Sequence, residues 1–279
     1  MKAIGSAALL CLLASSPSRA APDAPAFTFP AEMIQDFTAY PAEPPYCAFY
    51  RGRGKTLVFL AAEHGERSIP AVERLLSAQP APDAVIVERD SRQIDDAAFI
   101  GAHAHESEPD YAVKRARELG LPVFGGEPAP KDELAGVIAR GFTTQDYEGF
   151  YVIRTLLWGR RERSISRIIE EFSQEFDIQD RSLLLTERGF RDWYRNKNGK
   201  VYSREGLRRD ESWPAEDSLF SRRVAAAASR VRNARIGGVI ASAHGSRDRV
   251  LVVYGAGHQV ELSAALERML GRPELGACP

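Results

Sequence analysis

The chain has 279 residues, of which 44% are hydrophobic and 27% are charged. These values are ordinary for a globular protein of one large domain or two small ones, and they exclude a disordered chain. The formal net charge is −1. Because affinity for a phosphate backbone needs clustered positive charge, we expect no nucleic-acid partner.

Residues 1–20 differ from the rest of the chain. A short basic start, Met1-Lys2, precedes a small and apolar stretch, and Ser18-Arg19-Ala20 offers small residues at a cleavage point. This pattern predicts a secretory signal peptide and a secreted or periplasmic protein. The apolar core is shorter than the roughly 20 residues that span a bilayer, so we expect no transmembrane segment in the mature chain. Cleavage leaves 35 basic and 38 acidic residues, a net charge of −3.

The mature chain keeps two cysteines, Cys47 and Cys278, because cleavage also removes Cys11. In an oxidising compartment the two can form a disulfide, and closing so long a loop stabilises a fold by several kcal/mol, about 2–5. The alternative is two unpaired thiols. Neither cysteine has a neighbour at the spacing of a metal or redox motif.

The first half of the chain alternates between strand and helix patterns. Residues 21–45, rich in Pro and Ala, predict an irregular lead-in, and 46–60 predict a hairpin around a glycine turn. Apolar runs of strand length then alternate with helical spacing, at 56–60, 68–77, 84–87, 111–119 and 121–124. This order is typical of βαβ units, so we predict an α/β fold with a central, mostly parallel sheet flanked by helices. Residues 91–110 interrupt the pattern and predict a long mobile connection.

The second half predicts mainly helix. Spacing in 130–213 indicates a helical insertion or cap, and a long helix follows from Pro214 towards Ala243. A strand at 250–254 and a helix at 259–270 complete the pattern. We therefore predict that 46–279 form a single α/β domain with a helical insertion.

Polar residues follow the predicted strands at the point where each strand ends. They are Glu63, His64, Glu88, Glu127 and His258. Parallel strands bring their carboxyl ends to one edge, where ligands bind in open α/β sheets. Two histidines with carboxylates can hold Zn or Mn through neutral imidazoles, and the same residues without metal can perform acid/base catalysis with a histidine pKa near 6.5. A third interpretation is a set of satisfied polar residues at a sheet edge.

Three short motifs resemble one family. Gly255-Ala256-Gly257-His258 after a Val-rich strand resembles the GxxH motif of the TraB/PrgY family, which includes GumN-like proteins and the Tiki proteases. Glu88, in the segment 85–90, is similar to that family's strand-end Glu-Leu-Asp. Segment 232–236 is similar to its Arg-Asn-x-x-Met. The first GxxH motif departs from the pattern, because Ala61 replaces the glycine before His64. His64-Gly65 also resembles erythromycin-esterase-like and ChaN-like proteins.

The resemblance implies a metal or catalytic centre at His64, Glu88 and His258, with Arg232 or Arg235 binding an anionic group. Glu63 and Glu127 join as catalytic candidates from their strand-exit positions. The resemblance further implies a metal-dependent hydrolase acting on a peptide or ester bond, in a peptide or small-molecule substrate. The alternatives are a non-catalytic protein that binds haem or another small ligand, as ChaN-like members do, and a protein whose site has decayed.

Overall fold

The computed structural model describes residues 28–52, 54–158, 162–216 and 219–279. The predicted signal peptide lies outside these ranges. In the described part of the lead-in, regular structure is confined to a short 3-10 helix, η1 (Ala31–Met33). The lead-in is otherwise irregular, as its composition predicts.

A six-stranded sheet forms the centre, in the order β4-β3-β5-β2-β1-β6. Strands β4, β3, β5 and β2 are parallel, whereas β1 runs antiparallel to both of its neighbours. The α/β class, the mostly parallel sheet and the β1–β2 hairpin are therefore confirmed. The strands are β1 (Tyr46–Gly52), β2 (Lys55–Ala62), β3 (Ala84–Val87), β4 (Val123–Gly125), β5 (Arg249–Gly255) and β6 (Glu274–Gly276).

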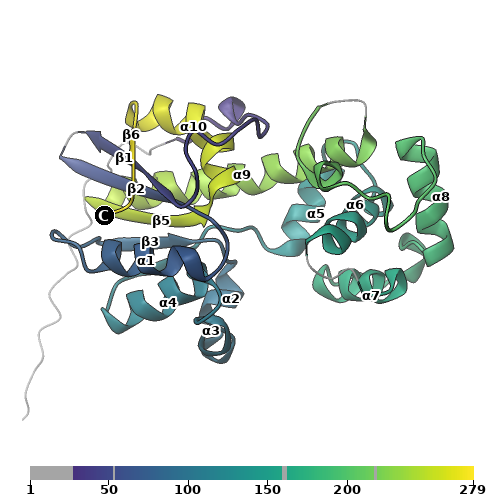
Figure 1. Ribbon diagram of the computed structural model, residues 1–279, viewed down its shortest axis with the longest axis horizontal. Helices are drawn as coiled ribbons and strands as arrows, with labels where there is room; N and C mark the ends of the chain where they lie inside the picture. The colour runs from purple at the N-terminus through teal and green to yellow at the C-terminus, as the bar shows by residue number, and fades with distance from the viewer. Residues whose placement is uncertain (1–27, 53, 159–161, 217–218) are drawn as a thin grey trace, which may run out of the picture.

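Helices cover both faces of this sheet (Figure 1). Helices α1 (Ile69–Leu76) and α4 (Glu108–Glu118) pack on one face, and α10 (Ala256–Leu270) with part of α9 (Phe220–Ser246) packs on the other. Alternate residues of β5 serve the two cores, Leu251 and Val253 on one side and Val250 and Val252 on the other. Burial on both faces explains why this strand is a continuous apolar run.

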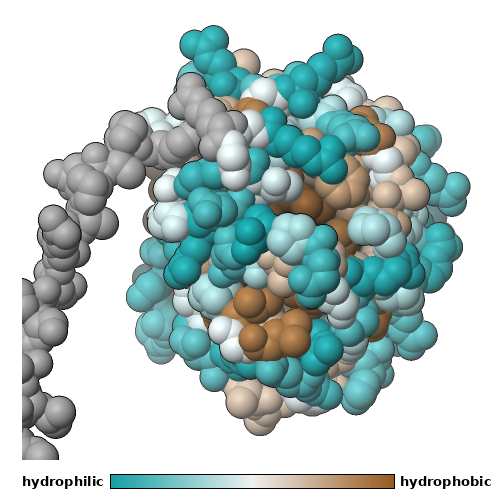
Figure 2. Space-filling view, turned by 90° about the vertical axis from the view of Figure 1, so that its left-hand side faces the viewer, coloured by the Kyte–Doolittle hydropathy of each residue, from teal (hydrophilic) through white to brown (hydrophobic). Residues whose placement is uncertain are grey.

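A helical lobe stands beside the sheet, on the right of Figure 1. It has its own apolar core, built around Phe172, Phe190 and Tyr194. Its sequence position matches the predicted helical insertion. Figure 2 shows the opposite end of the molecule, a mainly hydrophilic surface with small hydrophobic patches. The lobe comprises α5 (Pro130–Ile138), α6 (Thr144–Leu157), α7 (Ile165–Glu175), η3 (Arg181–Leu183), α8 (Glu187–Asn198) and η4 (Arg209–Ser212).

Helix α9 joins the two parts. Val224 and Ala228 in its first half lie in the core of the lobe, and Ile236 and Ile240 in its second half lie in a sheet core. The predicted start at Pro214 is wrong, because the Ala215 N–H donates to the Arg222 carbonyl and folds 213–216 back along the first turn. Among the described helices, none has the length and apolar character needed to cross a membrane.

The segment 91–110 is not the long mobile connection that its sequence suggests. It contains α2 (Ser91–Asp95), α3 (Ala97–His103) and the start of α4. The Asp90 carboxylate accepts from the Gln93 N–H at 2.9 Å, and Asp96 accepts from the Phe99 N–H at 2.9 Å. Side-chain caps therefore start α2 and α3. With five and seven residues, these two helices are too short to show the apolar periodicity of longer helices.

A disulfide joins Cys47 in β1 to Cys278 near the C-terminus, with 5.1 Å between the two Cα atoms. The predicted pairing is therefore confirmed. The neighbouring strand β6 pairs with β1 and places Gly276 opposite Cys47. The bond thus fixes the end of the chain to the antiparallel edge of the sheet.

Candidate metal centre

The carboxyl ends of the four parallel strands meet at one edge of the sheet, next to the helical lobe. Glu88 follows β3, Glu127 follows β4, and His258 lies in the first turn of α10 after β5. One ligand atom from each of these three residues lies within 4.8 Å of the others. Their side chains are only 11–13% exposed. The sheet therefore gathers three of the predicted site residues into one nearly buried cluster.

Glu88 is the centre of the cluster because both of its oxygens are shared. Oε1 accepts from Arg232 Nη2 at 3.2 Å and lies 3.6 Å from His258 Nε2. Oε2 accepts from the Gly255 N–H at 2.8 Å and lies 3.7 Å from His64 Nε2. Burial opposes ionisation of Glu88, but its interactions with His64, His258 and Arg232 outweigh burial and hold the Glu88 pKa well below its usual value. Glu88 is therefore a carboxylate.

Helix α9 orients the His258 ring. His258 Nδ1 lies 2.7 Å from Asn233 Oδ1, and the Asn233 amide nitrogen donates to Glu261 Oε2 at 2.5 Å. Because the amide nitrogen is used by Glu261, the amide oxygen faces the ring and accepts from Nδ1–H. The other ring nitrogen of His258, Nε2, faces Glu88.

His64 is held in a similar way by a residue that the sequence analysis missed. Its Nδ1 lies 2.8 Å from Glu108 Oε1, and Glu108 is 1% exposed. An ionised carboxylate only accepts hydrogen bonds, so Nδ1 carries a proton and Nε2 faces Glu88. The carboxylates of Glu88 and Glu108 raise the pKa of His64 to about 9. Without a metal, His64 is therefore an imidazolium at neutral pH, although 62% of its side chain is exposed.

Arg232 supplies a fixed positive charge inside the cluster. Its Nε donates to Glu127 Oε2 at 2.6 Å, and only 15% of its side chain is exposed. The other oxygen, Glu127 Oε1, is buried and has no hydrogen-bond partner among the described residues. Arg232 thus binds two carboxylates, and the buried hydroxyl of Tyr254 also lies beside Glu127.

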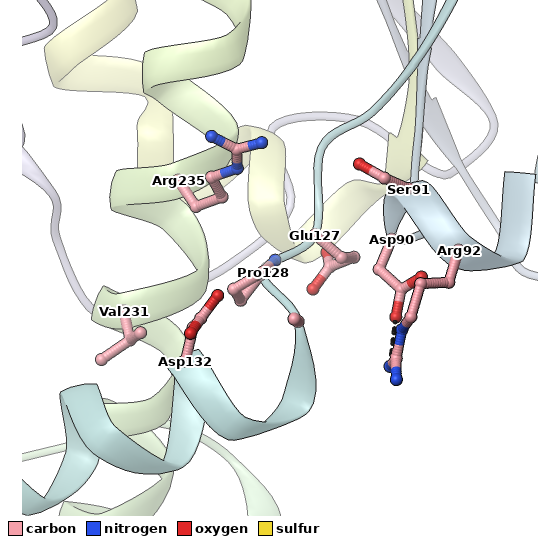
Figure 3. Close-up of a pocket in the computed structure, with 9 residues that line it drawn as sticks. Asp90, Ser91, Arg92, Glu127, Pro128, Asp132, Val231 and Arg235 are labelled. Carbon is pink, nitrogen blue, oxygen red and sulfur yellow. Dashed lines mark hydrogen bonds and ion pairs between the residues drawn. The ribbon is translucent and has the colours of Figure 1, made fainter. Parts of the chain in front are cut away.

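Arg235 lies one turn further along α9, in a pocket beside the cluster (Figure 3). The pocket has a volume of about 430 Å³ and includes Glu127 in its wall. Arg235 is exposed, and no carboxylate of the described residues forms an ion pair with it. Of the two predicted anion-binding arginines, Arg232 is committed to the cluster and Arg235 faces open space. The other wall residues are Asp90, Ser91, Arg92, Pro128, Ala129, Asp132 and Val231.

Glu63 is separate from the cluster. Its carboxylate forms an ion pair with Arg67 at 2.6 Å, one turn ahead in sequence, and not with a residue of the described cluster. Glu63 and His64 are adjacent, and successive residues leaving a strand point to opposite sides. Only one of these two adjacent residues can therefore face the site. That residue is His64, whose Nε2 faces Glu88.

No family model matches this chain, and no curated protein or solved structure matches it.

Proposed function

We propose that this protein is a metal-dependent hydrolase of the TraB/GumN type that acts on a peptide or ester bond. One observation carries the proposal. His64 and His258 direct Nε2 to different oxygens of Glu88, while each Nδ1 is held by a protein acceptor. Histidines that bind metals have this arrangement, because the acceptor fixes the tautomer and the ring orientation.

The residues present fit a divalent cation. The donors are imidazole nitrogens and carboxylate oxygens, which suit Zn or Mn. Glu127 offers a further carboxylate oxygen to the same cluster, beside Glu88 and His258. His64, Glu88 and His258 would hold the metal, with Glu127 beside it. A divalent cation would also displace the proton of His64, so the net charge of the cluster would rise by one unit instead of two on binding.

The protein's own groups supply the rest of the chemistry. A bound Zn²⁺ or Mn²⁺ provides Lewis-acid activation of water and of the scissile carbonyl group. Glu127 lines the pocket and would take the proton that the attacking water loses and pass it to the leaving group as the scissile bond breaks. Arg232 binds the carboxylates of Glu88 and Glu127, and Arg235 binds an anionic group of the substrate.

Export to an oxidising compartment belongs to the same proposal. The Cys47–Cys278 disulfide supports it, because disulfides persist outside the cytosol and are rare within it. We propose that the mature protein is secreted or periplasmic.

Metal analysis tests the function. Protein purified without residues 1–20 is dialysed against Zn²⁺ or Mn²⁺ at neutral pH, and the bound metal is measured before assays on peptide and ester panels with and without chelator. We expect His258→Ala to lose metal and hydrolysis together, and the exposed His105→Ala control to keep both. Retained metal in His258→Ala with lower thermal stability supports a structural histidine. If wild-type protein binds no divalent ion, metal-assisted hydrolysis is wrong and acid/base catalysis by Glu88 with His258 replaces it. Haem absorption bands after haem addition identify the ligand-binding alternative.

A further inference from the structure

A buried carboxylate on α4 clamps the segment that carries His64. Glu108 Oε1 binds His64 Nδ1 at 2.8 Å, and Glu108 Oε2 accepts from the N–H of the next residue, Gly65, at 2.9 Å. One side chain therefore holds both the ring and the backbone beside it. The bond to Gly65 fixes the Glu108 carboxylate against the backbone next to His64, so the acceptor that the ring contacts is itself held in place.

The position of Glu108 does not serve its own helix. A glutamate in the first turn commonly stabilises a helix by interacting with the free N–H groups there. Here both oxygens of Glu108 are used by His64 and Gly65, which lie outside α4. Glu108 is only 1% exposed, and both of its oxygens bind the segment that follows β2. We therefore assign the role of Glu108 to that segment and not to α4.

The same turn of α4 is also fixed to the strand that carries Glu88. Asp110 accepts two hydrogen bonds from Arg89, from Nε and Nη2, each at 2.7 Å. Arg89 Nη1 donates to the backbone carbonyl of Glu88 at 2.8 Å. Strands β2 and β3 are not neighbours, because β5 lies between them. The first turn of α4 therefore connects the exits of two separated strands and sets the spacing between His64 and Glu88.

We propose that Glu108 is a positioning residue that holds His64 with Nδ1 engaged and Nε2 directed at Glu88. The consequence for metal affinity rests on the proposed function. The orientation of the ring does not, because it follows from contacts that need no metal.

Ring-nitrogen NMR of metal-free protein tests the orientation. We expect a His64 Nδ1–H proton that exchanges slowly with water, assigned by its loss in His64→Gln. Glu108→Ala removes it, and Glu108→Gln keeps it in weakened form because the amide oxygen still accepts. The control is Glu73→Ala, which loosens the same helix by removing the contacts to Tyr111 and Arg115 without touching His64. A His64 Nδ1–H proton that still exchanges slowly in Glu108→Ala overturns the proposal. Loss of this proton signal to the same extent in Glu73→Ala also overturns it.

Titration with Co²⁺, followed by its visible absorption, tests the consequence. Loss of the group that orients a metal-binding histidine weakens affinity by about 10–100-fold, and we expect this for Glu108→Ala, with a smaller loss for Glu108→Gln. Glu73→Ala is expected to bind like wild type. Equal weakening in Glu73→Ala contradicts a specific role for Glu108. Failure of wild-type protein to bind Co²⁺ overturns the proposed function, and the ring-proton result then decides the positioning role alone.

Discussion

Gly255 lies directly against the His64 ring. A methyl group on the Gly255 Cα would be 2.6 Å from His64 Nε2 and 3.3 Å from Glu88 Oε2. The backbone of Gly255 has φ −55° and ψ 141°, a conformation that other residues adopt freely. Glycine is therefore required at this position because a side chain would not fit, and not because of its backbone conformation. The absence of a side chain at Gly255 leaves the space that His64 occupies next to Glu88.

Gly255→Ala is expected to remove metal binding while the fold survives. The added methyl group displaces the His64 ring, which is largely exposed and can move outwards, so we expect a stability loss of about 1–3 kcal/mol. Co²⁺ titration and urea unfolding measure the two effects. The matched control is Gly257→Ala, because a methyl group there meets only Phe37 at 4.0 Å. Equal metal affinity in the two variants would contradict the steric role of Gly255.

The stability of the metal-free protein is expected to fall with rising pH between about 6.5 and 9. The carboxylates of Glu88 and Glu108 raise the pKa of His64 from 6.5 to about 9, so protonated His64 stabilises the folded state. That contribution is fully present below pH 6.5 and is lost as the pH rises through 9. Solvent screening reduces its size, because the ring is 62% exposed. In urea unfolding, the free energy of unfolding should fall with pH across this range in wild type and in His105→Gln, but not in His64→Gln.

Metal affinity is expected to rise over the same pH range. Binding through Nε2 needs the His64 proton to leave, and the raised pKa of about 9 makes this costly at neutral pH. A histidine with an ordinary pKa would give affinity that levels off just above pH 6.5. Competition with a coloured chelator at several pH values separates the two cases, and a plateau from pH 7 upwards would show that His64 is not a ligand.

Arg235→Ala is expected to leave the metal content unchanged and to raise KM about tenfold for anionic substrates. Loss of one hydrogen bond to a charged group costs about 1.5 kcal/mol, which corresponds to that factor. Neutral analogues should show little change in KM. Arg232→Ala is the contrasting variant, because it leaves Glu88 and Glu127 without their cation and should change both metal affinity and stability. Loss of metal from Arg235→Ala would place that residue in the cluster instead.

Reduction of the disulfide is expected to lower the free energy of unfolding by about 2–5 kcal/mol. The bond closes a loop between residues 231 positions apart in sequence, so its loss frees the unfolded chain. Urea unfolding with and without reductant measures the change. The double variant Cys47→Ser, Cys278→Ser should have the same free energy of unfolding as the reduced protein, and reductant should not change this value. Two alkylatable thiols in the non-reduced protein would refute the pairing.

The sheet could be predicted from the sequence because its signals are local. Residues 250–254 and 57–62 are apolar at every position, and parallel strands buried on both faces need such runs. Strand exits then follow from the glycines and polar residues that end each run. The placement of Glu88 and His258 at one edge needs only the rule that parallel strands end on the same side.

The groups that orient the histidines could not be predicted in this way. Glu108 is the first residue of α4, where an acidic residue is ordinarily exposed, and nothing local to its sequence shows that it is buried. Asn233 belongs to a recognised motif, but its contact with His258 depends on how α9 crosses α10. Such contacts are made between distant elements, so only the three-dimensional arrangement reveals them.

Helix α9 runs from the core of the lobe into a sheet core, and Arg232 lies between these two halves. The Arg232 guanidinium forms ion pairs with Glu88 after β3 and with Glu127 after β4. One side chain on the connecting helix therefore binds two strand exits, so the lobe is attached to the sheet by charge as well as by apolar packing.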